Sequence, residues 1–346
     1  MFFAPLSIAV RGAEYHDRVR NADPATSVQE CAAPIAACFG RCASASCDRK
    51  NVEMVETRSA GPVKISPADS YRYCCRLAKR TGRNFYYSFL TLPRSMRRDM
   101  SVLYAFMRVT DDYGDDTEIP VAERRGLLAT WRAELHAAFD GEPVRHEVFP
   151  ALVEVAERHQ IPRDFLVEVI DGVESDLDPQ EFETFSDLER YCYRVAGVVG
   201  RSCIRIWGCH DPRADSAAVD CGVAFQVTNI LRDIGEDADI GRCYVPLEDL
   251  QRFGVTREAL RSHRYDGPFR ELMQFECRRA WDYYQRARLL RQYLSKPGRR
   301  VFRAMLGIYG SLLAEIERRR FEVFSSRVRL SRTRKLWIAA GALIRA

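Results

Sequence analysis

One segment in the second half of the chain is apolar over most of its surface yet carries four regularly spaced polar side chains. In "AFQVTNILRDIGEDADIGRCYVP", residues 224–246, Gln226, Asn229, Asp233 and Asp237 follow one another at intervals of three, four and four. On an α-helix such residues form one continuous stripe. The remaining surface is mostly Val, Ile and Leu, which predicts a buried helix, and burying an unpaired carboxylate costs several kcal/mol. The stripe therefore indicates a cation-binding or polar cavity; the alternative is a solvated face, which would more usually mix Lys, Glu and Arg.

A second acidic cluster lies earlier in the chain. "TDDYGDD", residues 110–116, follows the mostly apolar "LYAFMRV". Asp111 and Asp115 are four residues apart, as are Asp112 and Asp116, so on a helix the two pairs point about 100° from each other. Two carboxylates one turn apart can hold Mg²⁺ and leave its other positions to water and phosphate oxygens. We assign the first pair to a metal and expect the second pair to be solvated or to support the site from behind.

The chain from residue 66 to residue 346 is predicted to form one all-α domain of roughly ten helices. "SPAD" supplies an N-cap at Ser66, Pro67 at the first helical position and Asp69 in the first turn. Pro93 and Pro162 lie in similar start positions, as does Pro246. Beyond these starts, apolar residues recur three and four apart and strand-like alternation is scarce.

Residues 1–60 differ from the rest, being rich in Ala, Ser and Cys without sustained periodicity. They match neither a secretory signal nor a clean transit peptide. Two interpretations are open. The segment is either a poorly ordered N-terminal extension or the product of a mis-assigned start, with Met54 as the natural first residue.

Composition excludes several classes of protein. The net charge of +5 comes from 53 basic and 48 acidic residues spread along the chain, too weak an asymmetry to indicate nucleic-acid binding. No apolar run reaches the roughly 20 residues that cross a bilayer. The tail "LWIAAGALI", residues 336–344, either touches a membrane surface or packs on the domain, and we favour packing. The twelve cysteines show no CxxC pair and are expected to be reduced thiols in a cytoplasmic protein.

Four segments carry a resemblance to the squalene/phytoene synthase family. They are "FYYSFLTLP", "LYAFMRVTDDYGDD", "YCYRVAGVVG" and the acid-striped segment from Gln226 to Pro246, in the family's order. The resemblance implies a single-domain isoprenoid synthase fold with helices surrounding a central cavity. It also implies that Mg²⁺, with Mn²⁺ as a possible substitute, is held by two Asp-rich helices. Family members join two prenyl diphosphates head to head (1′-1 coupling) through a cyclopropylcarbinyl diphosphate.

The resemblance implies roles for the residues at matching positions. The implied metal ligands are Asp111, Asp115, Asp233 and Asp237. The implied diphosphate contacts are Arg108, Asn229, Tyr309 and Arg327. The residues implied to line the reaction centre, and assigned as catalytic, are Tyr104, Tyr191 and Gln226.

The chain departs from the family pattern at two places. Many members carry Ser residues just before the position of Phe85, where this chain has Gly82, Arg83 and Asn84. Arg83 is either a substitute phosphate ligand or a surface residue. Between the aspartates of the first motif, the family usually has apolar residues and this chain has Tyr113 and Gly114. Gly inside a helix costs about 1 kcal/mol relative to Ala, which predicts a looser helix there.

The leading hypothesis is a bacterial squalene-type prenyltransferase that couples two farnesyl diphosphates, giving presqualene diphosphate and then squalene or hydroxysqualene. The runner-up is a phytoene synthase that uses two geranylgeranyl diphosphates. A third hypothesis, from another class, is an inactive relative acting as an assembly or scaffold protein. NADPH use stays open, since no GxGxxG fingerprint is present. The expected location is cytoplasmic, either free or peripheral on the inner membrane face, and the oligomeric state is not predicted.

Overall fold

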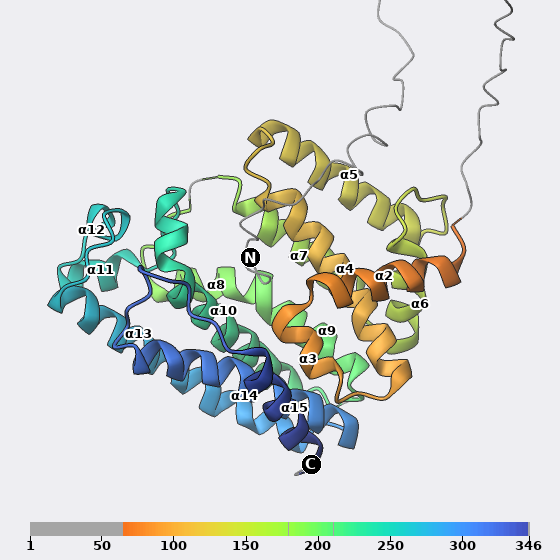
Figure 1. The fold of residues 1–346 in the computed structure, drawn as a ribbon. Coiled ribbons are helices and arrows are strands. Elements are labelled where there is room, and N and C mark those ends of the chain that lie inside the picture. The colour runs from red at the N-terminus through yellow and green to blue at the C-terminus, as the bar shows by residue number, and fades with distance from the viewer. Residues whose placement is uncertain (1–64, 179, 210, 345–346) are drawn as a thin grey trace, which may run out of the picture. The chain divides into compact units, whose positions relative to one another are not determined.

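The computed structural model describes residues 65–178, 180–209 and 211–344, and within them every regular element is helical (Figure 1). The all-α prediction is confirmed, with more helices than expected because several are short. The interpretation of residues 1–60 lies outside the described residues. The α-helices are α2 (Pro67–Thr81), α3 (Arg83–Phe89), α4 (Arg94–Asp115), α5 (Val121–Phe139), α6 (Phe149–His159), α7 (Arg163–Ser175), α8 (Phe185–Cys192), α9 (Val198–Ile206), α10 (Ala214–Asp239), α11 (Leu247–Phe253), α12 (Arg257–Arg261), α13 (Gly267–Ala287), α14 (Lys296–Arg318) and α15 (Arg332–Ile344). A π-helical turn, η1 (Tyr193–Gly197), joins α8 to α9, and a 3₁₀ turn, η2 (Arg288–Gln292), follows α13.

The helix starts follow local capping chemistry. The Ser66 hydroxyl accepts a hydrogen bond from the backbone N–H of Asp69 at 3.1 Å, and Pro67 is the first residue of α2, as predicted. Pro93, Pro162 and Pro246 lie one position earlier than expected, as the N-caps of α4, α7 and α11. The fixed φ of proline is compatible with either position, so the sequence located these starts only to within one residue.

Helix α10 is the buried helix around which the others assemble. Most of its residues are buried, and it packs against α13, α14, α9 and η1 (Figure 1). Gln226, Asn229, Asp233 and Asp237 are all buried in this environment. The stripe therefore faces inward, and the alternative of a solvated amphipathic face is wrong.

Two glycines allow α10 to approach its neighbours at backbone distance. A Cβ atom added to Gly222 would lie 2.4 Å from the carbonyl oxygen of Ala196, and one added to Gly200 would lie 2.5 Å from that of Ala218. Real Cβ atoms do not come so close to backbone, so larger residues would push η1 and α9 away from α10. Close helix packing is thus one reason for the small residues in "AGVVG".

The departure at Tyr113 and Gly114 has a packing explanation. A Cβ atom on Gly114 would lie 2.3 Å from Cγ1 of Val173, so the glycine lets the end of α4 meet α7. The Gly114 carbonyl also accepts a hydrogen bond from Nη1 of Arg124 at 2.8 Å. The Tyr113 ring packs edge-on against Trp131, with centroids 5.7 Å apart. The end of α4 is therefore anchored by α5 and α7, and the looser helix expected from the glycine is not what the contacts indicate.

The C-terminal helix α15 packs on α14 and α3 through its small residues, as the favoured interpretation of the tail predicted. Ala339 and Ala342 are buried, while Trp337 is 79% exposed and Ile344 is 84% exposed. Among the described residues, no helix combines the length and apolarity needed to cross a membrane.

We predict that Gly114→Ala lowers the free energy of unfolding. The added methyl group overlaps Val173, an overpacking cost of about 1 to 3 kcal/mol, against a helix-propensity gain of about 1 kcal/mol. In a double-mutant cycle, Val173→Ala should lower the free energy of unfolding by less in the Gly114→Ala background than in the wild type. Urea unfolding of the four proteins measures this coupling.

Gly126→Ala on α5 is the matched control, because nothing lies within 4 Å of its added Cβ. It should stabilise the protein by up to about 1 kcal/mol. Equal stabilisation by both substitutions would show that α4 and α7 do not meet as described.

Candidate functional site

Carboxylates from three helices gather at one buried place, here named the acidic basin: Asp111, Asp115, Asp176, Asp233 and Asp237. The first two come from α4 and the last two from α10, while Asp176 caps the end of α7. Burial, followed by the negative charge of Asp233, raises the pKa of Asp237 well above its usual range. Asp176 and Asp115 raise the pKa of Asp237 further, so all of these groups lie within electrostatic range of it. Burial likewise raises the pKa of Asp111.

Three arginines offset part of this charge. Arg242 lies 3.3 Å from the Asp115 carboxylate and donates to the backbone carbonyl of Asp176 at 3.2 Å. The Asp233 carboxylate accepts from Nε of Arg232 at 2.7 Å and from Nη2 of Arg327 at 2.8 Å. Arg327 also pairs with Glu236 at 2.7 Å. The described structure thus provides Asp233 with two guanidinium partners, whereas near Asp237 the charge of Arg242 is outweighed by burial and by the carboxylates of Asp233, Asp176 and Asp115.

Arg108 is arranged differently from the expectation. Its guanidinium donates to Asp112, one turn further along α4, with Nε 3.1 Å from the carboxylate. Asp112 had been expected to be solvated or to support the site from behind, and the structure gives it the second role, as the ion-pair partner of Arg108. Residues four apart on a helix are neighbours, so this pair was within reach of a sequence argument.

Sequence reasoning missed four residues of the site: Asp176, Arg232, Arg242 and Tyr244. The last three lie inside or just after α10, in the most specific motif, and their charges and phenol were the signal that pointed to them. Asp176 had no such signal, because "ESDLDP" is indistinguishable from an ordinary acidic loop. Its carboxylate accepts hydrogen bonds from the hydroxyls of Tyr191, at 2.9 Å, and Tyr244, at 3.0 Å.

The amide side chains of the stripe, Gln226 and Asn229, are buried, and within the described part of the chain they have amide atoms without hydrogen-bond partners. Among the described residues, Oε1 of Gln226 and both amide atoms of Asn229 make no hydrogen bond. Orphaned buried polar atoms normally have a partner, so a polar ligand is expected beside them. Asn229 lies next to the hydroxyl of Tyr309, whose pKa is raised by burial. Arg83 begins α3, but its side chain lies outside the described residues, so its assignment stays a prediction.

The residues present fit a divalent cation with oxygen ligands. Carboxylates and amide oxygens are hard donors of the kind that Mg²⁺ prefers. In the described ranges, no three acidic, His or Cys side chains form a ready-made metal cage. Mg²⁺ is commonly held by one or two carboxylates together with water and substrate phosphates, so an open basin suits it better than a closed cage.

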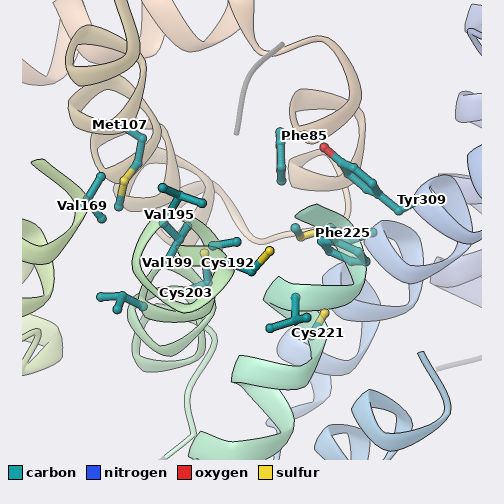
Figure 2. Packing of buried hydrophobic residues seen from close by; sticks show 14 of the residues in the cluster. Phe85, Met107, Val169, Cys192, Val195, Val199, Cys203, Cys221, Phe225 and Tyr309 are labelled. Atoms are coloured by element: carbon teal, nitrogen blue, oxygen red, sulfur yellow. The ribbon is translucent and has the colours of Figure 1, made fainter. Parts of the chain in front are cut away.

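An apolar pocket lies within the same helix assembly, on the half of α10 that precedes the acid stripe. Its lining comes from α3, η1, α9, α10, η2 and α14, and Figure 2 shows several of these side chains, among them Phe85, Val199, Cys203 and Phe225. The ring of Tyr309 stacks on that of Phe225, with centroids 4.3 Å apart, and its centroid lies 5.5 Å from that of Phe85. Tyr104 packs against Phe85 and donates to Oγ1 of Thr81 at 3.1 Å. The pocket thus adjoins, through Phe225 and Gln226, the polar groups of the stripe.

We predict opposite stability effects for two aspartates of the basin. Asp237→Asn should raise the melting temperature without divalent metal, because it removes one of several buried like charges. Asp233→Asn should lower the melting temperature, because Arg232 and Arg327 lose their shared carboxylate. The loss in free energy of unfolding should be on the order of 3 kcal/mol. Thermal unfolding in EDTA measures both. Shifts of the same sign would contradict the charge distribution described.

Comparisons with known proteins match the whole helical region. The model of the squalene/phytoene synthase family matches residues 78–334. A 15-cis-phytoene synthase of Synechococcus elongatus is 32% identical over 307 residues, covering 85% of this chain and 99% of that protein. A presqualene diphosphate synthase of Zymomonas mobilis is 39% identical over 193 residues, covering 55% of this chain and 66% of that protein. The crystal structure of a dehydrosqualene synthase in complex with ligand superposes with a TM-score of 0.74 at 26% identity, covering 80% of this chain and 96% of that one. The chain belongs to the squalene/phytoene synthase family and is a prenyltransferase that condenses prenyl diphosphates head to head.

Proposed function

We propose that this enzyme couples two farnesyl diphosphates, giving presqualene diphosphate and then squalene or hydroxysqualene. The observation that carries the proposal is the position of an apolar pocket next to a buried acidic basin. A prenyl diphosphate has the same two halves, a highly charged head and a hydrocarbon tail. The similarity to a presqualene diphosphate synthase supports the shorter substrate.

The basin is suited to the diphosphate end. We assign Asp111, Asp115, Asp233 and Asp237 to Mg²⁺, with Mn²⁺ as a substitute, because they are hard donors from α4 and α10. Asp115 is partly buried and the other three are buried. When bound, the metal would act as a Lewis acid that offsets the charge of the departing diphosphate. We assign four cations and polar groups near the basin to the diphosphate oxygens: Arg108, Asn229, Tyr309 and Arg327. Arg83 is proposed as a further diphosphate ligand from its place in the sequence. Preorganised donors of this kind need no reorganisation when the leaving group departs.

The pocket is suited to the prenyl chain and to the carbocation that remains. Its walls are aliphatic, aromatic or thiol side chains, which exclude the water that would quench a cation. Aromatic faces near the stripe, including those of Phe225 and Tyr309, can stabilise positive charge. We assign Tyr104, Tyr191 and Gln226 to the reaction centre between the two halves. Trp207 and Met305 contribute bulky apolar side chains to the lining.

Phytoene synthesis from two geranylgeranyl diphosphates is the second candidate. The relatives that align over most of the chain are mostly phytoene synthases, which favours it. An inactive scaffold protein is the weakest alternative, since the acidic residues and their arginine partners are all present.

Incubation with Mg²⁺ and either farnesyl or geranylgeranyl diphosphate, with and without NADPH, tests the substrate. We expect a C30 product, and its dependence on NADPH distinguishes squalene from hydroxysqualene. Asp111→Ala and Asp233→Ala should each reduce Mg²⁺-dependent diphosphate release by at least about 100-fold. Recovery of C40 phytoene would overturn the assignment of farnesyl diphosphate as substrate. Full turnover by both variants would overturn the metal assignment.

Asp140→Ala is a suitable control for these variants, because Asp140 is an exposed partner of Arg163 on the surface. It should leave turnover unchanged. Circular dichroism of each variant shows whether the helices are retained, so loss of activity can be separated from loss of folding.

We infer that α15 contacts an anionic membrane surface. Its inner face packs on α14, and its outer face presents Leu336, Trp337 and Ile344 to solvent. Exposed basic residues, Arg332 and Arg334, flank these apolar side chains. An apolar stripe beside positive charge is typical of helices that lie on anionic lipid, and a hydrocarbon product has to leave into a membrane.

Sedimentation with phosphatidylglycerol vesicles tests this contact. The protein should bind them and should bind phosphatidylcholine vesicles weakly, and Trp337→Ser should weaken binding several-fold. Leu289→Ser is the control, because Leu289 is 61% exposed on a different element. Equal binding to both vesicle types, or equal loss in both variants, would contradict a role for α15.

A further inference from the structure

The carboxylate of Asp176 is the meeting point of two tyrosines from different segments. Oδ2 accepts from the hydroxyl of Tyr191 on α8, at 2.9 Å, and Oδ1 accepts from that of Tyr244, in the link between α10 and α11, at 3.0 Å. All three side chains are buried. Because each oxygen of the carboxylate receives one phenol, both hydroxyl hydrogens have a defined direction.

The rings of these tyrosines are held as firmly as their hydroxyls. The ring centroids of Tyr191 and Tyr244 are 5.4 Å apart. The ring of Phe182 packs against both, with its centroid 5.5 Å from that of Tyr191 and 6.0 Å from that of Tyr244. The backbone carbonyl of Phe182 accepts from the N–H of Leu247 at 2.8 Å, which ties the segment before α8 to the start of α11. The three aromatic rings and one carboxylate therefore form a single buried unit.

This unit adjoins the acidic basin. Arg242 bridges it to α4, with one nitrogen 3.3 Å from the Asp115 carboxylate and another 3.2 Å from the Asp176 carbonyl oxygen. Val173, one turn before Asp176, lies in the close contact between α7 and Gly114. The position of Asp176 thus depends on the same helix packing that positions the first pair of aspartates.

We propose that Asp176 is a positioning residue that holds Tyr191 and Tyr244 with their protons turned toward it and their oxygens and rings available to the reacting cation. A phenol that donates to a carboxylate is more electron-rich than a free phenol, so it stabilises positive charge better. Burial and the charge of Asp176 raise the pKa of both phenols well above 10, which keeps them protonated donors. The proposal rests on the assignment of Tyr191 to the reaction centre.

Asp176→Asn tests the proposal, because it keeps the shape of the side chain but replaces one acceptor with a donor. With the prenyl diphosphate that the wild type turns over, farnesyl or geranylgeranyl, kcat should fall by about 10- to 100-fold. KM and the Mg²⁺ concentration for half-maximal rate should change little. The triple variant Asp176→Asn, Tyr191→Phe, Tyr244→Phe should be no slower than the Tyr191→Phe, Tyr244→Phe double variant, because Asp176 acts through these hydroxyls.

Two results would overturn the proposal. A large rise in the Mg²⁺ requirement of Asp176→Asn would identify Asp176 as a metal ligand, and a further rate loss in the triple variant would show a role independent of the phenols. If Asp176→Asn does not fold, Tyr191→Phe and Tyr244→Phe test the proposal in its place. Each should lower kcat and leave KM unchanged, and an unchanged kcat in both would contradict the proposal. Using either substrate separates this test from the choice of farnesyl over geranylgeranyl diphosphate.

Tyr283→Phe is the matched control. The Tyr283 hydroxyl also donates to a carboxylate, that of Glu189 on α8, at 2.5 Å, but Glu189 lies two residues before Tyr191 and therefore on another face of the helix. This variant should keep kcat within about twofold of the wild type, which shows that loss of a phenol–carboxylate hydrogen bond near α8 is not enough to slow the reaction.

Discussion

The burial of several carboxylates at one place is the constraint on which the rest of the structure depends. Water would stabilise each charge, but α4, α7 and α10 remove it from their inner faces, and the negative charges then repel one another. Arg232 and Arg327 compensate Asp233, and Arg242 compensates Asp115. Asp237 remains in surroundings that disfavour its charged form. A site with this imbalance is prepared for an additional cation.

Such a basin requires rigid walls, and close helix contacts supply them. Gly222 and Gly200 let α10 meet η1 and α9 at backbone distance, and Gly114 leaves room on α4 for the Val173 side chain of α7. These contacts also bring the apolar pocket and the basin onto successive turns of one helix, α10. The basin thus suits the charged end of a prenyl diphosphate and the pocket suits its hydrocarbon end, and both belong to one rigid helix assembly.

Sequence reasoning worked where local periodicity carried the information. The inward stripe on α10, the start of α2 and the all-helical class are local properties, since spacing, capping and hydrophobic pattern determine them within a few turns. It did not predict that Asp112 pairs with Arg108, and it missed Asp176, which no nearby residue marks as special. The interpretation of Gly114 as a loosening residue was also incomplete, because its partner Val173 lies on another helix.

The sequence by itself determined the helical class, the two acidic motifs and the inward direction of the stripe, because each follows from residue types at helical spacing. The family came from the resemblance of four motifs to known proteins. Only the tertiary structure decided which arginine pairs with which aspartate, and that Asp176 joins Tyr191 to Tyr244. The physical reason is that most of these contacts connect different helices or loops, with separations from 15 positions for Asp176 and Tyr191 to 127 for Asp115 and Arg242. Their geometry depends on how closely whole helices pack, and a spacing rule along one helix contains no information about that distance.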